Sequence, residues 1–273
     1  MSLTESAIHS PQYAEWIRRE RLRGLKVLIG RVGFLLVFLL AWEMLARFQI
    51  VNPFLTSYPS AIGPTFISLM ETSPQQAGIL AHTFATVLAT MIGLSLAMFF
   101  GTIAAAALWW WEDLYKMVDP YLVVANAMPK TAFVPIFYIW LGPTQSIYAM
   151  SLAIALFVTI MMIYVGFQST DANKIKLART LGATKRQILT KVVLPGSIPV
   201  MIAALKVSAG LSLVGVVVGE FQSASVGLGY LIQYGSQIFR LDMVVTALTV
   251  LAGVSSLIYA AIVWVENLAM SRR

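Results

Sequence analysis

Ionisable side chains are rare in the apolar stretches of this sequence, and three of them could act on a solute. Lys130, Lys206 and Glu220 lie inside or at the end of such stretches. A charged group in lipid is costly, so it tends to face protein or a water-filled cavity. Pro129 bends the chain directly before Lys130. A bent helix that carries a cation could line a path for an anion.

Each of these groups also has a plainer interpretation. The long side chains of Lys130 and Lys206 can reach a headgroup region, and Lys130 can instead neutralise an acid on a neighbouring helix. Glu220 precedes a glycine-rich turn, Gly227 to Gly229, where flexible backbone could form part of a gate or meet a binding protein. As a charge at a helix end, Glu220 needs no function.

Other kinds of site find little support. The chain has no cysteine, so a disulfide, a thiolate metal site and a cysteine nucleophile are excluded. His82 and Thr83 have no partners at metal-ligand spacing, and we interpret them as polar residues at a helix start. Clustered His, Asp or Glu, expected of a membrane enzyme, is lacking, and no phosphate-binding G-x-x-x-x-G-K-[ST] sequence occurs. We therefore expect no catalytic residue, no metal and no cofactor in this chain.

The composition places most of the chain in a membrane. Of 273 residues, 59% are hydrophobic and 11% are charged, with a mean hydropathy of +0.80. No polar segment reaches the roughly 50 residues of a soluble domain. Counting stretches of about 20 apolar residues predicts an all-α membrane protein with six transmembrane helices near 25–47, 79–108, 118–140, 145–167, 198–219 and 243–265.

Basic residues predict the orientation of these helices. They are concentrated before the first span, between residues 171 and 191, and at the end of the chain, whereas residues 48–79 contain no Lys or Arg. The positive-inside rule therefore places both termini in the cytoplasm, and the net charge of +7 reports topology instead of nucleic-acid binding. We divide the chain into a cytoplasmic segment, 1–31, and a transmembrane domain, 32–273, with a cytoplasmic loop at 170–197. Glu43 and Arg47 share one face of the first span and can pair.

The loop at 170–197 predicts a helical hairpin. Thr170 can cap a first helix that ends near Leu181, with Gly182 in the left-handed position after it. Thr184 and Gln187 form a capping-box pattern that opens a second helix, which ends near Pro195.

One face of the first hairpin helix is apolar, with Ile175, Ala178 and Leu181 at i, i+3 spacing. Such a face suits docking onto another protein. It also suits an amphipathic helix held at anionic headgroups, and local sequence favours neither.

The same loop resembles the EAA loop of the permease subunits of binding-protein-dependent ABC importers. The resemblance rests on residues 176–183, KLARTLGA, and on Leu194-Pro195 and Pro199. Lys176 stands where the family usually has Glu, and Leu177 where it has Ala. Further similarity, to the nitrate, sulfonate and taurine branch, lies at residues 41–43, 58–60, 82–83, 129–135, 140–142, 215–221 and 227–232.

The resemblance implies a type I ABC importer permease fold, a multi-pass protein of the bacterial inner membrane that acts as a homodimer. The implied partners are an ABC ATPase subunit, which uses ATP and Mg, and an external solute-binding protein. The hairpin would be the coupling helix that sits in a cleft of the ATPase. The residues that inherit this role are Lys176, Leu177, Ala178, Arg179, Gly182, Ala183 and Thr184.

The resemblance is compatible with several classes of solute. The branch implies a sulfonate, taurine, nitrate or a similar anion, and other relatives imply a vitamin precursor such as a pyrimidine or riboflavin. Residues Lys130, Glu220, Gly227 and Gly229 are the candidates for a pathway or gate. An ion-driven secondary transporter is a further alternative, for which inverted repeats and a midplane ion site would be expected, and neither is evident.

Overall fold

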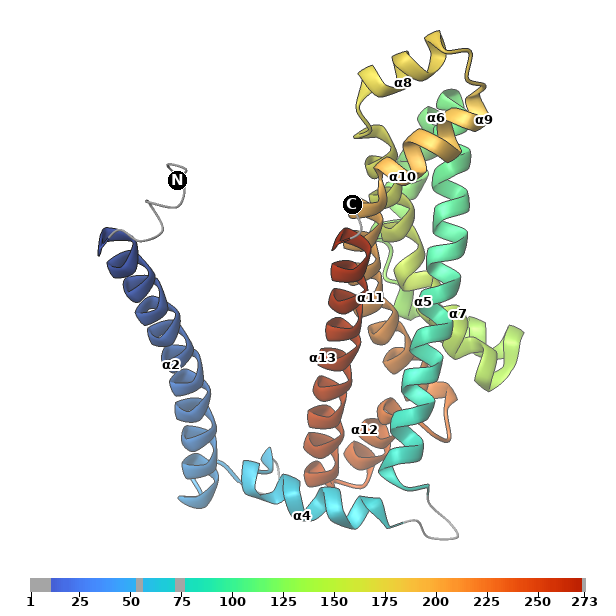
Figure 1. Ribbon diagram of the computed structural model, residues 1–273. Helices are drawn as coiled ribbons and strands as arrows, with labels where there is room; N and C mark the ends of the chain where they lie inside the picture. The colour runs from blue at the N-terminus through green and yellow to red at the C-terminus, as the bar shows by residue number, and fades with distance from the viewer. Residues whose placement is uncertain (1–10, 53–55, 72–76, 272–273) are drawn as a thin grey trace. The chain divides into compact units, whose positions relative to one another are not determined.

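The computed structural model describes residues 11–52, 56–71 and 77–271, and every regular element in these ranges is a helix (Figure 1). The elements are α2 (Pro11–Arg47), α4 (Pro59–Met70), α5 (Ile79–Trp110), α6 (Glu112–Ala127), the 3₁₀-helix η1 (Lys130–Phe133), α7 (Val134–Gln168), α8 (Ala172–Thr180), α9 (Lys185–Ile188), the π-helical η2 (Leu189–Val193), α10 (Leu194–Gly196), α11 (Ile198–Ser223), α12 (Leu228–Gln237) and α13 (Leu241–Ser271).

The chain divides into two compact units between Ile62 and Gly63. In the first unit, the predicted pair on α2 forms, with Arg47 Nε 2.9 Å from Glu43 Oε1. The same carboxylate also accepts hydrogen bonds from the backbone N–H and the hydroxyl of Ser60, at 3.1 and 2.8 Å. Glu43 therefore joins α2 to the start of α4.

Five described helices are long and apolar enough to cross a membrane, where the sequence predicted six. They cover Arg18–Arg47, Ile79–Trp110, Lys130–Gln168, Ile198–Ser223 and Leu241–Leu268. Five of the predicted spans lie within these five helices, one in each. The predicted span at 118–140 is the error, because only residues 130–140 of it fall in a candidate span, and that span is the one that also contains 145–167.

Proline and glycine explain this error. The apolar stretch at 118–140 is interrupted where α6 ends at Ala127, Pro129 takes an extended conformation and the short η1 follows. Within α7, Gly142 has φ 80° and ψ 177°, directly before Pro143, so α7 consists of two helical parts on either side of a sharp break. Hydropathy counts apolar residues and does not register these changes of direction.

Small residues allow the central helices α5, α7 and α11 to approach closely. Gly215 of α11 faces the backbone of α7, where an added Cβ atom would lie 2.6 Å from Ser151 Cα, and Gly219 faces Ile147 Cα in the same way. Fully buried hydroxyls lie in the same contact, with Thr159 Oγ1 2.6 Å from Ser208 Oγ. In lipid, where apolar burial between helices contributes little, such close contacts stabilise helix association.

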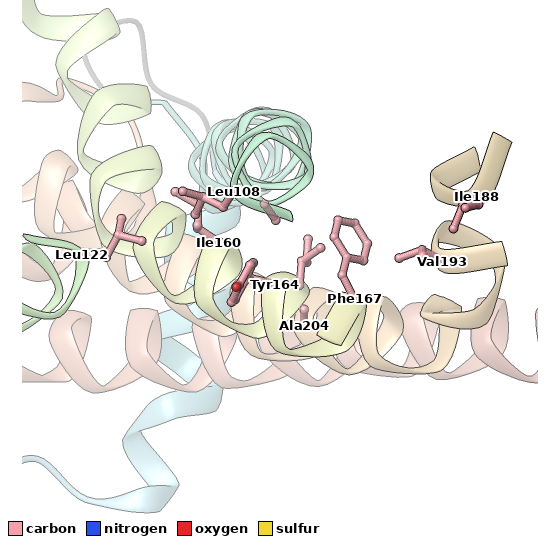
Figure 2. Packing of buried hydrophobic residues seen from close by; sticks show 10 residues of the cluster. Leu108, Leu122, Ile160, Tyr164, Phe167, Ile188, Val193 and Ala204 are labelled. Atoms are coloured by element: carbon pink, nitrogen blue, oxygen red, sulfur yellow. The ribbon is translucent and has the colours of Figure 1, made fainter. Parts of the chain in front are cut away.

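The largest buried cluster lies where the 169–197 segment meets the bundle (Figure 2). Ile188 and Val193 come from α9 and η2, and they share this cluster with Phe167 at the end of α7. Leu108 of α5 and Ala204 of α11 belong to the same cluster. The segment between α7 and α11 is therefore packed onto three membrane helices at once.

Candidate functional site

The predicted hairpin forms at one end of the bundle, with α8 beyond the end of α5 and α9 beside it (Figure 1). Gly182 has φ 78°, the left-handed conformation that was expected after the first helix. Both hydrogen bonds of the capping box are present, one from the Gln187 N–H to the Thr184 side chain and one from the Thr184 N–H to the Gln187 side chain. The cap of the first helix was predicted one residue too early: Asp171 caps α8, and its side chain accepts a hydrogen bond from the Asn173 N–H at 2.8 Å.

The second half of the hairpin is less regular than predicted. Instead of one helix, α9 continues into the π-helical turn η2 and then into α10. Pro195 has no N–H to donate to the preceding turn, and a widened turn next to it accommodates that loss. π-helical turns are frequent at functional sites.

The predicted apolar face of α8 is correct for two of its three residues. Ile175 and Ala178 are half-buried against the large cluster, whereas Leu181 is 79% exposed. Leu177, four residues before Leu181, is 61% exposed. Residues at i and i+4 share one helix face, so Leu177 and Leu181 form an outward apolar pair.

Most of the other predicted coupling residues are exposed, and one is half-buried. Lys176, Arg179, Gly182 and Thr184 are exposed, while Ala183 is half-buried next to Ala178. The Ala183 N–H donates to the Ala178 carbonyl at 3.0 Å, which fixes the corner after α8. We name the outward group formed by Lys176, Leu177, Arg179 and Leu181 the α8 outer face.

The base of the hairpin is closed by hydrogen bonds between the helices on either side of it. The Ser197 hydroxyl lies 2.9 Å from the Gly166 carbonyl on α7 and 2.8 Å from the Val193 carbonyl. Gly166 also approaches Val200 of α11 so closely that an added Cβ atom would lie 2.9 Å from its side chain. The base of the hairpin is therefore attached to both α7 and α11.

Lys130 lies beside an open groove on the bundle. The groove has a volume of about 500 Å³ and is almost entirely apolar, with Phe133, Phe137, Trp140 and Phe157 among its lining residues. The Lys130 ammonium group donates to the Asn126 carbonyl at 2.7 Å and lies 5.6 Å from the centre of the Phe157 ring. We name this feature the Lys130 groove.

Glu220 lies at the opposite end of the bundle from the hairpin and is only 2% exposed. Its carboxylate accepts hydrogen bonds from the Thr86 hydroxyl, at 2.8 Å to Oε1, and from the Gly229 N–H, at 2.7 Å to Oε2. Gly227 lies against the same carboxylate. The structure thus brings together three of the four predicted gate residues, and it places Lys130 elsewhere.

The sequence alone did not point to Thr86, the side-chain partner of Glu220. His82 lies in the first turn of α5, as predicted, and it also contacts the backbone of Gly227, which was not predicted. The available pattern was the i, i+4 spacing of His82 and Thr86, which puts both on one face of α5.

Lys206 does not reach outward as the sequence suggested. Its ammonium group lies 2.5 Å from Glu266 Oε2 on α13, and both side chains are less than a quarter exposed. The partner is 60 residues away in sequence, so a reading of the fifth span alone could not find it. Among the residues that the structure describes, no three His, Cys, Asp or Glu side chains gather as a metal site.

Comparison with known proteins gives a consistent result. Residues 97–272 match the family model of the binding-protein-dependent transport system inner membrane component. A probable ABC transporter permease protein of Haemophilus influenzae is 30% identical over 84% of this chain and 91% of its own length. A formylaminopyrimidine transport permease protein of Halalkalibacterium halodurans is 30% identical over 88% and 94%, and a taurine transport system permease protein of Escherichia coli 26% over 83% and 83%.

A solved structure supports the fold. A chain in an inward-facing structure of the MetNI methionine ABC transporter matches with a TM-score of 0.65, covering 73% of this chain and 99% of that chain at 19% identity. At this identity the likeness concerns the arrangement of the helices alone.

Proposed function

This chain belongs to the family of binding-protein-dependent transport system inner membrane components, and from this premise we propose that it carries a small organic solute through the membrane by alternating access. It is an ABC importer permease and a multi-pass inner membrane protein. ATP and Mg would be used by a separate ATPase subunit, a solute-binding protein would deliver the solute, and the permease would work as a homodimer.

The observation that carries this proposal is the α8 outer face. Leu177 and Leu181 expose apolar surface on the side of α8 that faces away from the large cluster, and Lys176 and Arg179 flank them. Buried apolar anchors with a polar rim are the usual composition of a protein contact. We assign this face to the ATPase subunit, with the half-buried Ala178 and Ala183 and the turn at Gly182 holding it in place.

Movement would pass from the hairpin to the membrane helices through the closed base. When the ATPase subunits approach each other, α8 would be displaced, and the Ser197 contact would transmit the displacement to α7 and α11. Rigid-body rotation of helices about an interface is an established form of switching. The solute would then face alternate sides of the membrane.

The docking assignment is tested by replacing both outward leucines. Leu177→Ser with Leu181→Ser removes the apolar pair without touching the buried side of α8, and we expect the ATPase subunit of the same importer to dissociate during purification. Lys191→Ser is the matched control, because Lys191 is also an exposed residue of the hairpin region. A doubly substituted permease that still retains the ATPase and imports solute would overturn the assignment.

For the solute we propose a small organic compound that carries an anionic group, such as taurine or another sulfonate, because the Lys130 groove combines one cation with aromatic walls. Relatives named for taurine, aliphatic sulfonate, formylaminopyrimidine and riboflavin transport support an organic solute in general. Nitrate, which has no apolar part, matches the groove less well.

Two measurements test this choice. Binding of taurine, a pyrimidine, riboflavin and nitrate to the solute-binding protein identifies the class, and uptake is then compared in Lys130→Met and Lys130→Arg permeases. An anionic solute predicts loss of uptake in Lys130→Met and retention in Lys130→Arg. Binding only of compounds that lack an anionic group, or unchanged uptake in Lys130→Met, would contradict this assignment.

A further inference from the structure

The start of α12 is held by side chains from two other helices. Three consecutive backbone N–H groups, those of residues 227, 228 and 229, each donate a hydrogen bond to a buried side chain. The acceptors are His82 Nδ1 for Gly227 (2.9 Å), Thr86 Oγ1 for Leu228 (2.8 Å) and Glu220 Oε2 for Gly229 (2.7 Å). We name His82, Thr86 and Glu220 the α12 cap.

The α12 cap supplies hydrogen-bond acceptors for backbone N–H groups that have no acceptor within the helix. The first N–H groups of any helix have no partner within it, and the positive end of the helix dipole favours an acceptor there. α12 has ten residues, a length at which a helix depends on contacts outside itself. No residue of α12 supplies these acceptors, so the cap fastens α12 to α5 and α11.

The three cap residues support each other. The Thr86 hydroxyl donates its proton to Glu220 and accepts from Leu228, so both of its roles are used. Because His82 Nδ1 accepts from Gly227, Nε2 carries the proton and donates to the Ala77 carbonyl at 3.1 Å. The three side chains are at most 3% exposed.

Two glycines make room for the cap. A Cβ atom at Gly227 would lie 2.5 and 2.6 Å from the two carboxylate oxygens of Glu220, and Gly227 has φ 140°, which side-chain-bearing residues rarely adopt. At Gly229 a Cβ atom would lie 2.9 Å from Glu220 Oε2. The backbone of this turn is therefore fitted to the carboxylate.

The position of the cap gives it a mechanical role. The hairpin precedes the first residue of α11 and α12 follows the last, so the two lie at opposite ends of one membrane-spanning helix (Figure 1). α5 also connects them, since His82 lies in its first turn and Leu108 belongs to the cluster beneath the hairpin. α5 and α11, the two helices that hold α12, therefore both extend to the buried cluster beneath the hairpin.

We propose that His82, Thr86 and Glu220 are positioning residues for transport, which make α12 move as one body with α5 and α11 when the hairpin is displaced. Without the cap, α12 keeps its apolar cluster, in which Leu231 packs with Met243 of α13 and Ile79 of α5, and loses its polar attachment to α5 and α11. The inference rests on the proposed function, because the displacement originates at the ATPase.

The test uses a pair of substitutions at one position. Thr86→Val has nearly the volume of threonine and lacks the hydroxyl, whereas Thr86→Ser keeps the hydroxyl. Each permease is reconstituted with its ATPase and binding protein, and solute imported per ATP hydrolysed is measured. We expect Thr86→Val to lower this ratio by about tenfold, since the lost hydrogen bonds leave buried groups unsatisfied, and Thr86→Ser to stay within about twofold of the original.

A second readout follows α12 directly. The chain has no cysteine, so Gln237→Cys, at the exposed end of α12, gives a single site for a spin label. We expect a more mobile label in the Thr86→Val background and an unchanged label with Thr86→Ser. If the α12 cap only stabilised the fold, Thr86→Val would lower the amount of folded complex. The solute imported per ATP hydrolysed and the mobility of the label in the remaining complex would then be unchanged.

The outcomes separate this inference from the proposed function. Absence of ATP-dependent uptake in the unmodified complex would overturn the proposed function itself. Normal uptake in the unmodified complex, together with an unchanged ratio or an unchanged label in Thr86→Val, would overturn only the role of the cap. If Thr86→Val yields no folded complex, Glu220→Leu, of similar volume and without acceptors, is measured by the same two readouts and decides in the same way.

Discussion

The ammonium group of Lys185 donates a hydrogen bond of 2.6 Å to the backbone carbonyl of Trp110 and lies 5.5 Å from the centre of the Trp110 indole ring. Trp110 is the last residue of α5, and Lys185 is the first residue of α9. Carbonyls at the end of a helix lack partners within it, and a cation there is favourable. This contact fastens the hairpin to α5, separately from its base at Ser197.

Replacing Lys185 tests whether this contact contributes to coupling. Lys185→Met keeps the length of the side chain and removes the donor, so we expect fewer solute molecules imported per ATP hydrolysed, while the ATPase remains bound. Lys185→Arg retains a donor and a cation above the ring and should behave like the original. Lys191→Met, also an exposed lysine near the hairpin, is the control. Equal transport per ATP in Lys185→Met and Lys191→Met would show that the contact is dispensable.

The turn between α8 and α9 should tolerate asparagine and reject proline. Gly182 has φ 78°, and its N–H donates to the Arg179 carbonyl at 3.0 Å. Proline fixes φ near −65° and has no N–H, so Gly182→Pro should abolish ATP-dependent uptake by disrupting the hairpin. Asparagine adopts left-handed conformations more readily than most residues, and Gly182→Asn should retain uptake. Normal uptake by a well-expressed Gly182→Pro permease would contradict the coupling role of the hairpin.

The close contact of α7 and α11 predicts different effects of two similar substitutions. Gly215→Ala places a methyl group 2.6 Å from the backbone of Ser151, and we expect the free energy of unfolding to fall by about 1–3 kcal/mol. Gly210→Ala, on the same helix, meets nothing within 4 Å. Thermal unfolding in detergent measures both, and equal melting temperatures would refute the close approach at Gly215.

The ion pair of Lys206 and Glu266 predicts non-additive substitutions. Lys206→Met leaves the carboxylate of Glu266 without its partner in a largely buried site and should destabilise the permease. Adding Glu266→Gln removes the unpaired charge and should restore part of the melting temperature. A double-mutant cycle measures the coupling. Additive losses would mean that the pair contributes nothing to the contact of α11 with α13.

Local sequence patterns predicted the hairpin well because its structure depends on local chemistry. The left-handed Gly182 and the capping box of Thr184 and Gln187 are both confirmed, since each depends on residues within four positions. The cap of the first helix is Asp171, where Thr170 was predicted. Both residue types can cap a helix, and sequence alone does not distinguish two adjacent candidates. The irregular η2 was not predicted, because the capping residues mark where a helix starts and not how its turns are wound.

Features that depend on distant parts of the chain were not predictable in the same way. Thr86 and Glu220 are 134 residues apart in the sequence, so Glu220 looked like a charge at a helix end until the fold placed both residues at the start of α12. The predicted span at 118–140 failed for another reason. A hydropathy window over 118–140 sums apolar residues across the break at Pro129, and it cannot distinguish one straight helix from several short ones.

The fit between Glu220 and its two glycines also limits how sequences of this kind can diverge. A shorter residue at position 220 would vacate the volume into which side chains at 227 and 229 would project, and a side chain at either glycine would displace the carboxylate. Substitutions at positions 220, 227 and 229 are therefore expected to occur together. Homologous permeases that have lost the acid are where larger residues should be found in the turn before α12.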